Sequence, residues 1–288
     1  MAGNPIRTLE DAREFIESVG LCLLFPLAPQ EGRGASPGRL LLAPTFVGAC
    51  IGRDDNLPIV QRAFSDPRAQ SAVELMVRLL RERGAYEANL FGDDNSLLIA
   101  ASIFPYFYAL VGDRNPRQQP KPGAAGRSGG GLSPLADDVL AAIYREGPIV
   151  KPMLREVLGG ELSLTAVDHA LADLWSRLKI TRVDYNSKDG AAWDILYRWS
   201  PEAVNEGAHL SVGESLSALI SKYLDAVVAA EASEIEDFFS NVVSRSRVKE
   251  AVNALLAARE LSFVHVGKRT LLQVTPLPMD SSRPARRA

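Results

Sequence analysis

The chain has 288 residues, of which 47% are hydrophobic and 23% charged, a composition typical of a globular protein with two or three domains. No run approaches the ~20 apolar residues that a membrane span needs. The N-terminus shows no basic stretch followed by an apolar one, as a secretory signal would. Cys22 and Cys50, the two cysteines, both stand beside apolar residues, which fits a reducing compartment. We therefore expect a cytoplasmic protein with no membrane partner. The net charge of −3 does not by itself suggest nucleic acid as a partner.

The first expected domain covers residues 5–112 and combines helices with short strands. Thr8 should cap a helix that runs to Ser18, with Asp11 completing a weakened capping box. An apolar strand over 21–25 follows this helix. These elements suggest an α+β domain, and a degenerate winged helix is one interpretation of their order. The remaining expected elements are a Gly- and Pro-rich loop over 28–44, a helix over 66–83, a hairpin formed by 86–91 and 97–99, and an aromatic helix over 102–111.

A stretch rich in Pro, Gly, Gln and Arg follows over residues 113–132 and predicts a flexible linker. Apolar side chains are almost absent from it, so it buries too little surface to offset its ordering entropy. Between Arg114 and Gly131 the basic residues have no acid among them. Non-specific phosphate contact therefore stays open beside the simpler role of a tether. The basic tail over 279–288 is expected to be disordered as well.

Residues 133–207 predict a winged helix, which is a helix-turn-helix followed by a β-hairpin. Ser133-Pro134 begins the first helix, Gly147-Pro148 ends it, and a second helix runs to Leu158. Strands over 180–185 and 193–199 are expected to flank a wing over 186–191. The third helix begins at Ser163 and is expected to bury five residues with helical spacing, namely Leu164, Val167, Leu171, Leu174 and Leu178.

The same order of elements returns in residues 208–278. A helix ending at Val227 and a short helical segment over 233–239 precede a third helix over 244–259. The third helix of such a unit is shaped to enter the major groove of DNA. The predicted fold class is therefore mainly α with small β-hairpins, arranged as tandem winged-helix domains. Strands over 263–266 and 270–274, joined at Gly267-Lys268, complete the second unit.

Charge is unevenly distributed within this last unit. Residues 202–237 hold eight acids against the single Lys222, whereas residues 244–278 hold six basic residues against Glu250 and Glu260. The third helix and the hairpin can therefore face a polyanion although the whole chain is acidic. A solvated charged surface would show the same pattern, so that alternative stays open.

The third helix of the last unit provides most of the candidate DNA-binding residues. Arg245, Lys249 and Asn253 are spaced by four and share one face. Asn can read adenine, whereas Arg or Lys can read guanine or hold a phosphate. Ser246 lies beside the free backbone N–H groups at the helix start and can donate to a phosphate. Lys268 and Arg269 stand at the tip of the hairpin.

The middle unit offers fewer candidates for contact with DNA. Thr165 and His169 should point outward from its third helix, and Lys188 lies on its wing. Asp168 would repel a phosphate on the same helix. This unit is therefore expected to serve packing or a protein partner as readily as DNA.

No catalytic or metal-binding constellation stands out in the sequence. There is no phosphate-binding glycine loop, and serine, cysteine and histidine form no nucleophile signature. The three histidines are far apart and have no cysteine near them, which argues against zinc. Asp54-Asp55 and Asp93-Asp94 are best interpreted as turn carboxylates, and Tyr106, Phe107 and Tyr108 as part of a buried helix. We expect no catalytic residue, no metal and no cofactor.

Two short segments resemble the AlkZ/YcaQ-type DNA glycosylases. One is the helix-to-strand junction Ser18-Val19-Gly20-Leu21-Cys22-Leu23-Leu24-Phe25-Pro26, and the other is Phe104-Pro105-Tyr106-Phe107-Tyr108-Ala109-Leu110, which looks like a sequence of shorter AlkZ-related proteins. The resemblance implies tandem winged helices and a tendency to bind DNA. Proteins of that family unhook bulky alkyl adducts and interstrand crosslinks at purines.

The resemblance does not extend to the catalytic motif of the family. Those glycosylases carry Gln-x-Gln or Gln-x-Asp on the strand after the first helix, to position water and stabilise the developing sugar cation. The matching strand here, 21–25, contains no Gln, Asp or Glu. Apolar side chains can neither accept a proton nor stabilise an oxocarbenium charge. The resemblance therefore implies the fold and DNA, and it supplies no catalytic residue.

The leading hypothesis is a winged-helix protein that binds double-stranded DNA in a repair context without the glycosylase chemistry of its relatives. Two alternatives stay open. The first is a divergent DNA glycosylase that acts on alkylated or crosslinked bases with other carboxylates. The second is a winged-helix module that binds a protein partner.

Overall fold

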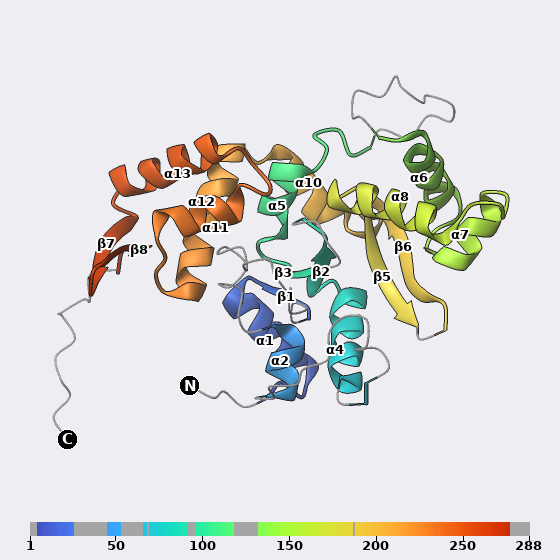
Figure 1. Ribbon diagram of the computed structural model, residues 1–288, viewed down its shortest axis with the longest axis horizontal. Coiled ribbons are helices and arrows are strands. Elements are labelled where there is room, and N and C mark those ends of the chain that lie inside the picture. The colour runs from blue at the N-terminus through green and yellow to red at the C-terminus, as the bar shows by residue number, and fades with distance from the viewer. Residues whose placement is uncertain are drawn as a thin grey trace.

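The computed structural model describes residues 5–25, 45–52, 66–67, 69–90, 96–117, 132–186 and 188–276. Within these residues the protein is mainly helical, and its strands form small antiparallel sheets (Figure 1). The predicted fold class is confirmed in this respect. No helix in the described part of the chain has the length and apolarity needed to cross a membrane. The loop expected over 28–44, the acid pairs Asp54-Asp55 and Asp93-Asp94, and the tail over 279–288 lie outside the described residues.

The N-terminal elements follow from clear local signals. Helix α1 (Leu9–Val19) begins at Thr8, whose hydroxyl accepts a hydrogen bond from the Asp11 N–H at 3.1 Å. The Asp11 carboxylate accepts in turn from the Thr8 N–H at 3.0 Å, so the predicted capping box is confirmed. These hydrogen bonds hold the pKa of Asp11 below its usual value. The helix ends at Gly20, whose φ of 76° suits glycine.

A three-stranded sheet follows α1, in the order β1-β3-β2. The predicted hairpin is present as β2 (Ala85–Ala88) and β3 (Leu97–Ala100), and β1 (Leu21–Leu23) lies on the other side of β3. Thr45 caps a short helix, α2, that the sequence did not indicate. The helices of this region are α2 (Phe46–Ile51), α4 (Gln70–Arg81) and α5 (Phe104–Val111).

The middle unit has the predicted order of three helices and a hairpin. Its sheet also contains a short strand between the first two helices, which pairs with the second strand of the hairpin. Its elements are α6 (Pro134–Glu146), β4 (Ile149–Val150), α7 (Lys151–Val157), α8 (Leu164–Ser176), β5 (Ile180–Asn186) and β6 (Gly190–Ile195).

Two predictions for the middle unit are wrong. The expected strand over 193–199 ends at Ile195, and the chain turns into α9 (Leu196–Trp199) and then α10 (Pro201–His209). Arg198 stabilises this turn, since it pairs with Asp194 four residues earlier and donates to the Ile143 carbonyl at 2.9 Å. Leu164 was expected in the core, yet it is 47% exposed because it occupies the first position of α8.

The last unit matches its predicted order. Val248, Val252 and Leu255 are buried as expected. The first strand of the hairpin begins two residues before the expected position. The elements are α11 (Val212–Val227), α12 (Ala232–Phe239), α13 (Arg245–Ala257), β7 (Leu261–Val266) and β8 (Arg269–Val274).

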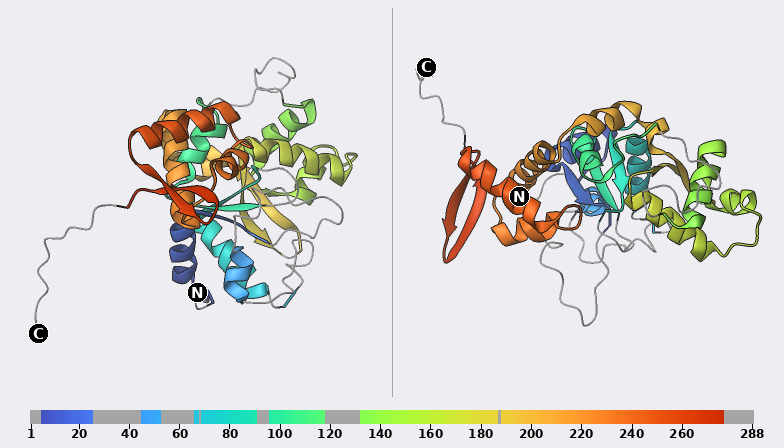
Figure 2. Two further views of the ribbon diagram at one scale, coloured as in Figure 1. Left: turned by 60° about the vertical axis from the view of Figure 1, so that its left-hand side comes forward. Right: turned by 90° about the horizontal axis from the view of Figure 1, so that it is seen from above.

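The buried side chains form two separate clusters. One belongs to the middle unit and contains Ile143, Leu174 and Trp193. The other is continuous from the N-terminal elements to the last unit, so that Phe107 and Tyr223 belong to the same core. Helix α5 contacts both α10 and α11. The hairpin β7–β8 and the helices α6 and α7 lie at opposite ends of the molecule (Figure 2).

Helix α10 approaches α5 closely because Gly207 has no side chain. A Cβ atom at Gly207 would lie 2.5 Å from the Pro105 carbonyl oxygen and 2.9 Å from the Tyr108 Cβ. The start of the predicted linker is held against the same helices, since Arg114 donates to the Ala208 carbonyl at 3.0 Å and to the Ala109 carbonyl at 3.2 Å. Residues 118–131 of that linker lie outside the described part of the chain.

A buried polar junction joins the N-terminal sheet to the middle unit. Glu87 on β2 is 2% exposed, and its carboxylate lies 2.7 Å from an Arg182 nitrogen. The Arg182 guanidinium lies 4.2 Å from the ring centroid of Trp175 and 5.0 Å from that of Trp193. The Trp175 indole N–H donates to the Glu87 carbonyl at 3.0 Å. The junction therefore combines an ion pair, a hydrogen bond and cation–π contacts.

Candidate nucleic-acid interface

Helix α13 presents its polar side chains to solvent because its apolar side packs on α11 and α12. Val248 and Leu255 are buried in the core, whereas Arg245, Lys249 and Asn253 are exposed. Ser246 is exposed in the first turn of the helix. The tip of the β7–β8 hairpin exposes the remaining candidates of this unit, Lys268 and Arg269.

Sequence reasoning missed Arg247, which is also exposed in the first turn of α13. The signal was present, because Arg245, Arg247 and Lys249 are three basic residues within five positions. Selecting only positions four apart removed Arg247 from the set. Within the described residues neither Arg247 nor Lys268 forms an ion pair.

The other basic candidates are paired with carboxylates of α12. The Arg245 Nε lies 3.1 Å from a Glu236 oxygen, and the same guanidinium also pairs with Asp237. The Lys249 ammonium lies 3.7 Å from the same Glu236 oxygen. The acidic and basic segments that the sequence separates thus lie against each other in the fold.

The hairpin repeats this pairing at its tip. Arg269 lies 2.6 Å from a Glu231 oxygen and 3.1 Å from a Glu234 oxygen. The hydrogen bond and the charge of Glu231 raise the pKa of Arg269 above its usual value. The side chains of Arg245, Lys249 and Arg269 remain 52%, 58% and 57% exposed, so water screens each pair and its contribution to stability is small. A phosphate group can therefore compete for these cations.

The N-terminus of α13 lacks the side-chain cap that comparable helices have. Ser133, Ser163 and Ser211 each accept a hydrogen bond from a backbone N–H in the first turn of their helices. Ser244 makes no such bond, and its hydroxyl lies 3.1 Å from that of Ser246. The free N–H groups at this end attract anions. Arg245 and Arg247 stand in the same turn, and Lys249 follows at the start of the next turn.

The middle unit exposes a different surface. Thr165 and His169 are exposed on α8, as predicted, and Lys188 is exposed on the wing. The Lys188 N–H donates to the Asn186 side-chain oxygen at 3.0 Å, which fixes the turn. Asp168 pairs with Lys151 at 2.9 Å, so its charge is partly neutralised. The same end also exposes apolar side chains, with Met153 57% and Leu164 47% exposed.

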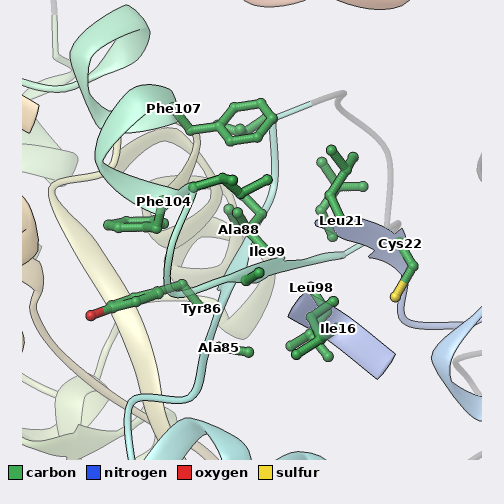
Figure 3. Packing of buried hydrophobic residues seen from close by; sticks show 14 of the residues in the cluster. Ile16, Leu21, Cys22, Ala85, Tyr86, Ala88, Leu98, Ile99, Phe104 and Phe107 are labelled. Carbon is green, nitrogen blue, oxygen red and sulfur yellow. The ribbon is translucent and has the colours of Figure 1, made fainter. Parts of the chain in front are cut away.

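Strand β1 carries no group that can act on a substrate. Leu21, Cys22 and Leu23 are 4%, 2% and 6% exposed, and the strand pairs with β3 (Figure 3). Burial raises the pKa of the Cys22 thiol, and it raises that of Cys50 to about 12, so both stay protonated near neutral pH. In the part of the chain that the structure describes, no three or more His, Cys, Asp or Glu residues gather as metal ligands would.

The structure thus defines a mainly helical protein in which three helices and a hairpin occur twice, with basic residues gathered on the last copy. Residues 95–288 match the family model described as DNA glycosylase AlkZ-like. The chain therefore belongs to the AlkZ-like DNA glycosylase family. The matched range includes the aromatic segment 104–110 from which the resemblance was drawn, and it excludes the segment 18–26.

One solved protein, the DNA glycosylase AlkZ of Streptomyces sahachiroi, is similar to this chain. The sequences are 16% identical, the TM-score is 0.48, and the match covers 70% of this chain and 55% of that one. The chain thus spans about half the length of that protein. No curated protein matches the sequence.

Proposed function

We propose that this protein binds double-stranded DNA through α13 and the β7–β8 hairpin, as a cytoplasmic protein in a repair context. The observation that carries the proposal is the first turn of α13. Arg245 and Arg247 are exposed there, next to backbone N–H groups that no serine caps, and Lys249 is exposed at the start of the next turn. Membership of a family of DNA glycosylases supports DNA as the polyanion. Strand β1 supplies no residue for glycosylase chemistry in this proposal.

The acids of α12 tune this binding. Glu236 and Asp237 occupy the cations of α13 when no DNA is present, and phosphates replace them when DNA binds. The exchange is inexpensive because exposed ion pairs contribute about 0–1 kcal/mol each. These acids also repel other parts of the DNA backbone. Binding should therefore be weaker, and less steep in its salt dependence, than the six basic residues of 244–278 alone would suggest.

The direct test removes the candidate cations and measures binding to a random duplex over a salt series. Replacing Arg245, Lys249, Lys268 and Arg269 with alanine should weaken binding and reduce the salt slope by up to ~3–4 units, since each phosphate contact contributes about 0.9. A control variant with Arg7, Arg78 and Arg145 replaced by alanine, all exposed and away from α13, should bind normally. Unchanged binding in the first variant, with native circular dichroism, would place the DNA contact elsewhere.

A gain of affinity provides the complementary test. Glu236→Gln removes the carboxylate shared by Arg245 and Lys249 without removing a cation. Affinity for duplex DNA should rise about two- to fivefold, because Arg245 and Lys249 both lose an ion-pair partner that contributes little to stability. Asp138→Gln on α6 changes the net charge equally and should have a much smaller effect. Equal effects of both variants would mean that only net charge matters.

Asn253→Ala should alter sequence preference with little change in the salt slope.

A second candidate function applies to the middle unit alone. Its exposed apolar side chains, Met153 and Leu164, favour a protein partner. Replacing Thr165, His169 and Lys188 with alanine should then leave the affinity for duplex DNA within about twofold. A loss comparable to that of the α13 variant would assign DNA binding to both units.

The absence of polar side chains on β1 also predicts the outcome of a glycosylase assay. Duplexes that carry alkylated or crosslinked purines should yield no abasic product above the uncatalysed background. Product formation would instead support a divergent glycosylase that uses other carboxylates, since some group must stabilise the oxocarbenium charge.

A further inference from the structure

A cavity of about 550 Å³ lies where α5, α6 and the end of β6 meet, apart from α13 and the hairpin. Its size falls within the about 300–1,000 Å³ that is usual for small-molecule sites. Leu140, Leu178 and Ile195 provide apolar surface. Three tyrosines, three basic residues and Asp113 also line it.

The charges around this cavity do not cancel. Lys179 pairs with Asp113, and Arg198 pairs with Asp194. The Arg198 guanidinium also donates to the Tyr144 carbonyl at 2.7 Å, so a second part of it is already hydrogen-bonded. Arg117 has no carboxylate partner among the described residues, and its Nε donates to the Tyr197 hydroxyl at 2.9 Å. One exposed guanidinium at the cavity is therefore free to hold an anion.

The tyrosines differ in what they can offer a ligand. The Tyr108 hydroxyl donates to the Asp113 carbonyl at 3.0 Å, and the ring is 3% exposed, so this residue forms part of the wall. The Tyr197 ring is covered by the Arg117 guanidinium at 6.0 Å. Tyr144 is 39% exposed at the end of α6. Its ring is therefore the one available for stacking with a planar group.

From these features we propose that the cavity binds a nucleotide-like ligand, that is, a planar aromatic ring that carries a phosphate. The ring stacks on Tyr144 above the apolar wall, and the phosphate binds the Arg117 guanidinium, which suits it in charge and geometry. The ligand is either a free nucleotide or an unstacked nucleotide of a DNA strand. The proposal uses no residue of α13, so it does not rest on the function proposed above.

The experiment measures binding of AMP, adenosine and ribose 5-phosphate to the full chain by titration calorimetry. AMP should bind more tightly than either fragment by about tenfold or more, because both the ring and the phosphate contribute. Arg117→Gln should abolish the preference for AMP over adenosine. Tyr144→Ala should weaken both about tenfold, whereas Tyr144→Phe, which keeps the ring, should bind like the wild type. Arg145→Gln, an adjacent change at a residue that does not line the cavity, is the matched control.

Three results would overturn the proposal. They are no AMP binding at millimolar concentration, equal binding of AMP and ribose 5-phosphate, and Arg117→Gln or Tyr144→Ala variants that bind AMP like the control. Competition between AMP and DNA duplexes decides whether the ligand is a free nucleotide or a nucleotide of a DNA strand. A duplex with one bulged adenine that displaces AMP, when a fully paired duplex does not, identifies a strand nucleotide, whereas a bulged duplex without effect identifies a free one. The fourfold α13 variant should still bind AMP, which separates failure of this site from failure of duplex binding.

Discussion

The two copies of the repeated unit share their order of elements and differ in almost everything else. The middle copy has a core of its own, built around Ile143, Leu174 and Trp193. The last copy has none, because its buried residues continue into those of α1, α5 and the first sheet. Similar backbone order therefore does not make two copies equivalent as folding units.

Their surfaces differ in the same way. The third helix of the middle copy is capped by Ser163 and begins with the exposed Leu164. That of the last copy begins without a side-chain cap and with basic residues in its first turn. Both third helices keep apolar residues at the buried positions that the unit requires. Their exposed positions are not constrained in this way and can differ to suit different partners.

The largest expected effect concerns the two copies expressed alone. A fragment of residues 132–200 should fold and melt cooperatively, because it contains the whole cluster built around Ile143, Leu174 and Trp193. A fragment of residues 208–278 should be unfolded or much less stable, since α11 loses its contacts with α1 and α5. Thermal circular dichroism distinguishes the two. The comparison breaks down if the second fragment melts at the temperature of the intact protein.

Core truncations should reproduce this difference within the whole chain. Leu174→Ala and Leu255→Ala each remove a buried side chain, and each should cost about 2–5 kcal/mol. In Leu174→Ala, amide hydrogen exchange should become faster mainly in residues 134–195. In Leu255→Ala, exchange should become faster in the last unit and in α1 and α5 as well. Exchange confined to α11–β8 in Leu255→Ala would show that the shared core does not couple the two regions.

The polar junction of the middle copy should have an intermediate effect. Glu87→Gln leaves Arg182 without its carboxylate, and we expect a loss of about 1–3 kcal/mol because the Arg182 side chain is still 29% exposed. Glu82→Gln, at an exposed residue that pairs with Arg13, is the control and should cost less than about 0.5 kcal/mol. Urea denaturation measures both. Equal costs would mean that the junction adds nothing to an ordinary surface pair.

The smallest expected effect compares the serines before the two third helices. Ser163→Ala removes a capping hydrogen bond and should cost about 1 kcal/mol. Ser244→Ala removes no such bond and should cost less than about 0.5 kcal/mol. Urea denaturation of the full chain is again sufficient. A larger cost at Ser244 than at Ser163 would show that the two helix ends are not distinguished by their caps.

The sequence was sufficient to predict the elements that carry strong periodicity or strong caps. Helix α13 and the capping box of Thr8 were found because apolar spacing and side-chain capping are local. Helix α9 was missed because the alternation from Trp193 to Trp199 also suits a strand. The pairing of Arg198 with Asp194 and with the end of α6 decides between the two, and the second of these contacts is not local.

The candidate interface was predicted only in part, for a related reason. The basic residues of α13 and the acids of α12 were both visible in the sequence. That Glu236 lies between Arg245 and Lys249 depends on how the two helices pack. The cavity beside Tyr144 and Arg117 could not be predicted, because its lining comes from segments as far apart as Tyr108 and Arg198.

Gly207 affects how the two copies are oriented relative to each other. Helix α10 is the segment that joins the two copies, and its distance from α5 is set by the missing methyl group, since a Cβ there would lie 2.5 Å from the Pro105 carbonyl oxygen. That oxygen belongs to the backbone and cannot swing aside. Any larger residue would act as a wedge that tilts the connecting helix and, with it, the direction in which one copy faces relative to the other. Gly207 is thus one position on which the relative direction of the two surfaces depends, beside the junction of Glu87 with Arg182.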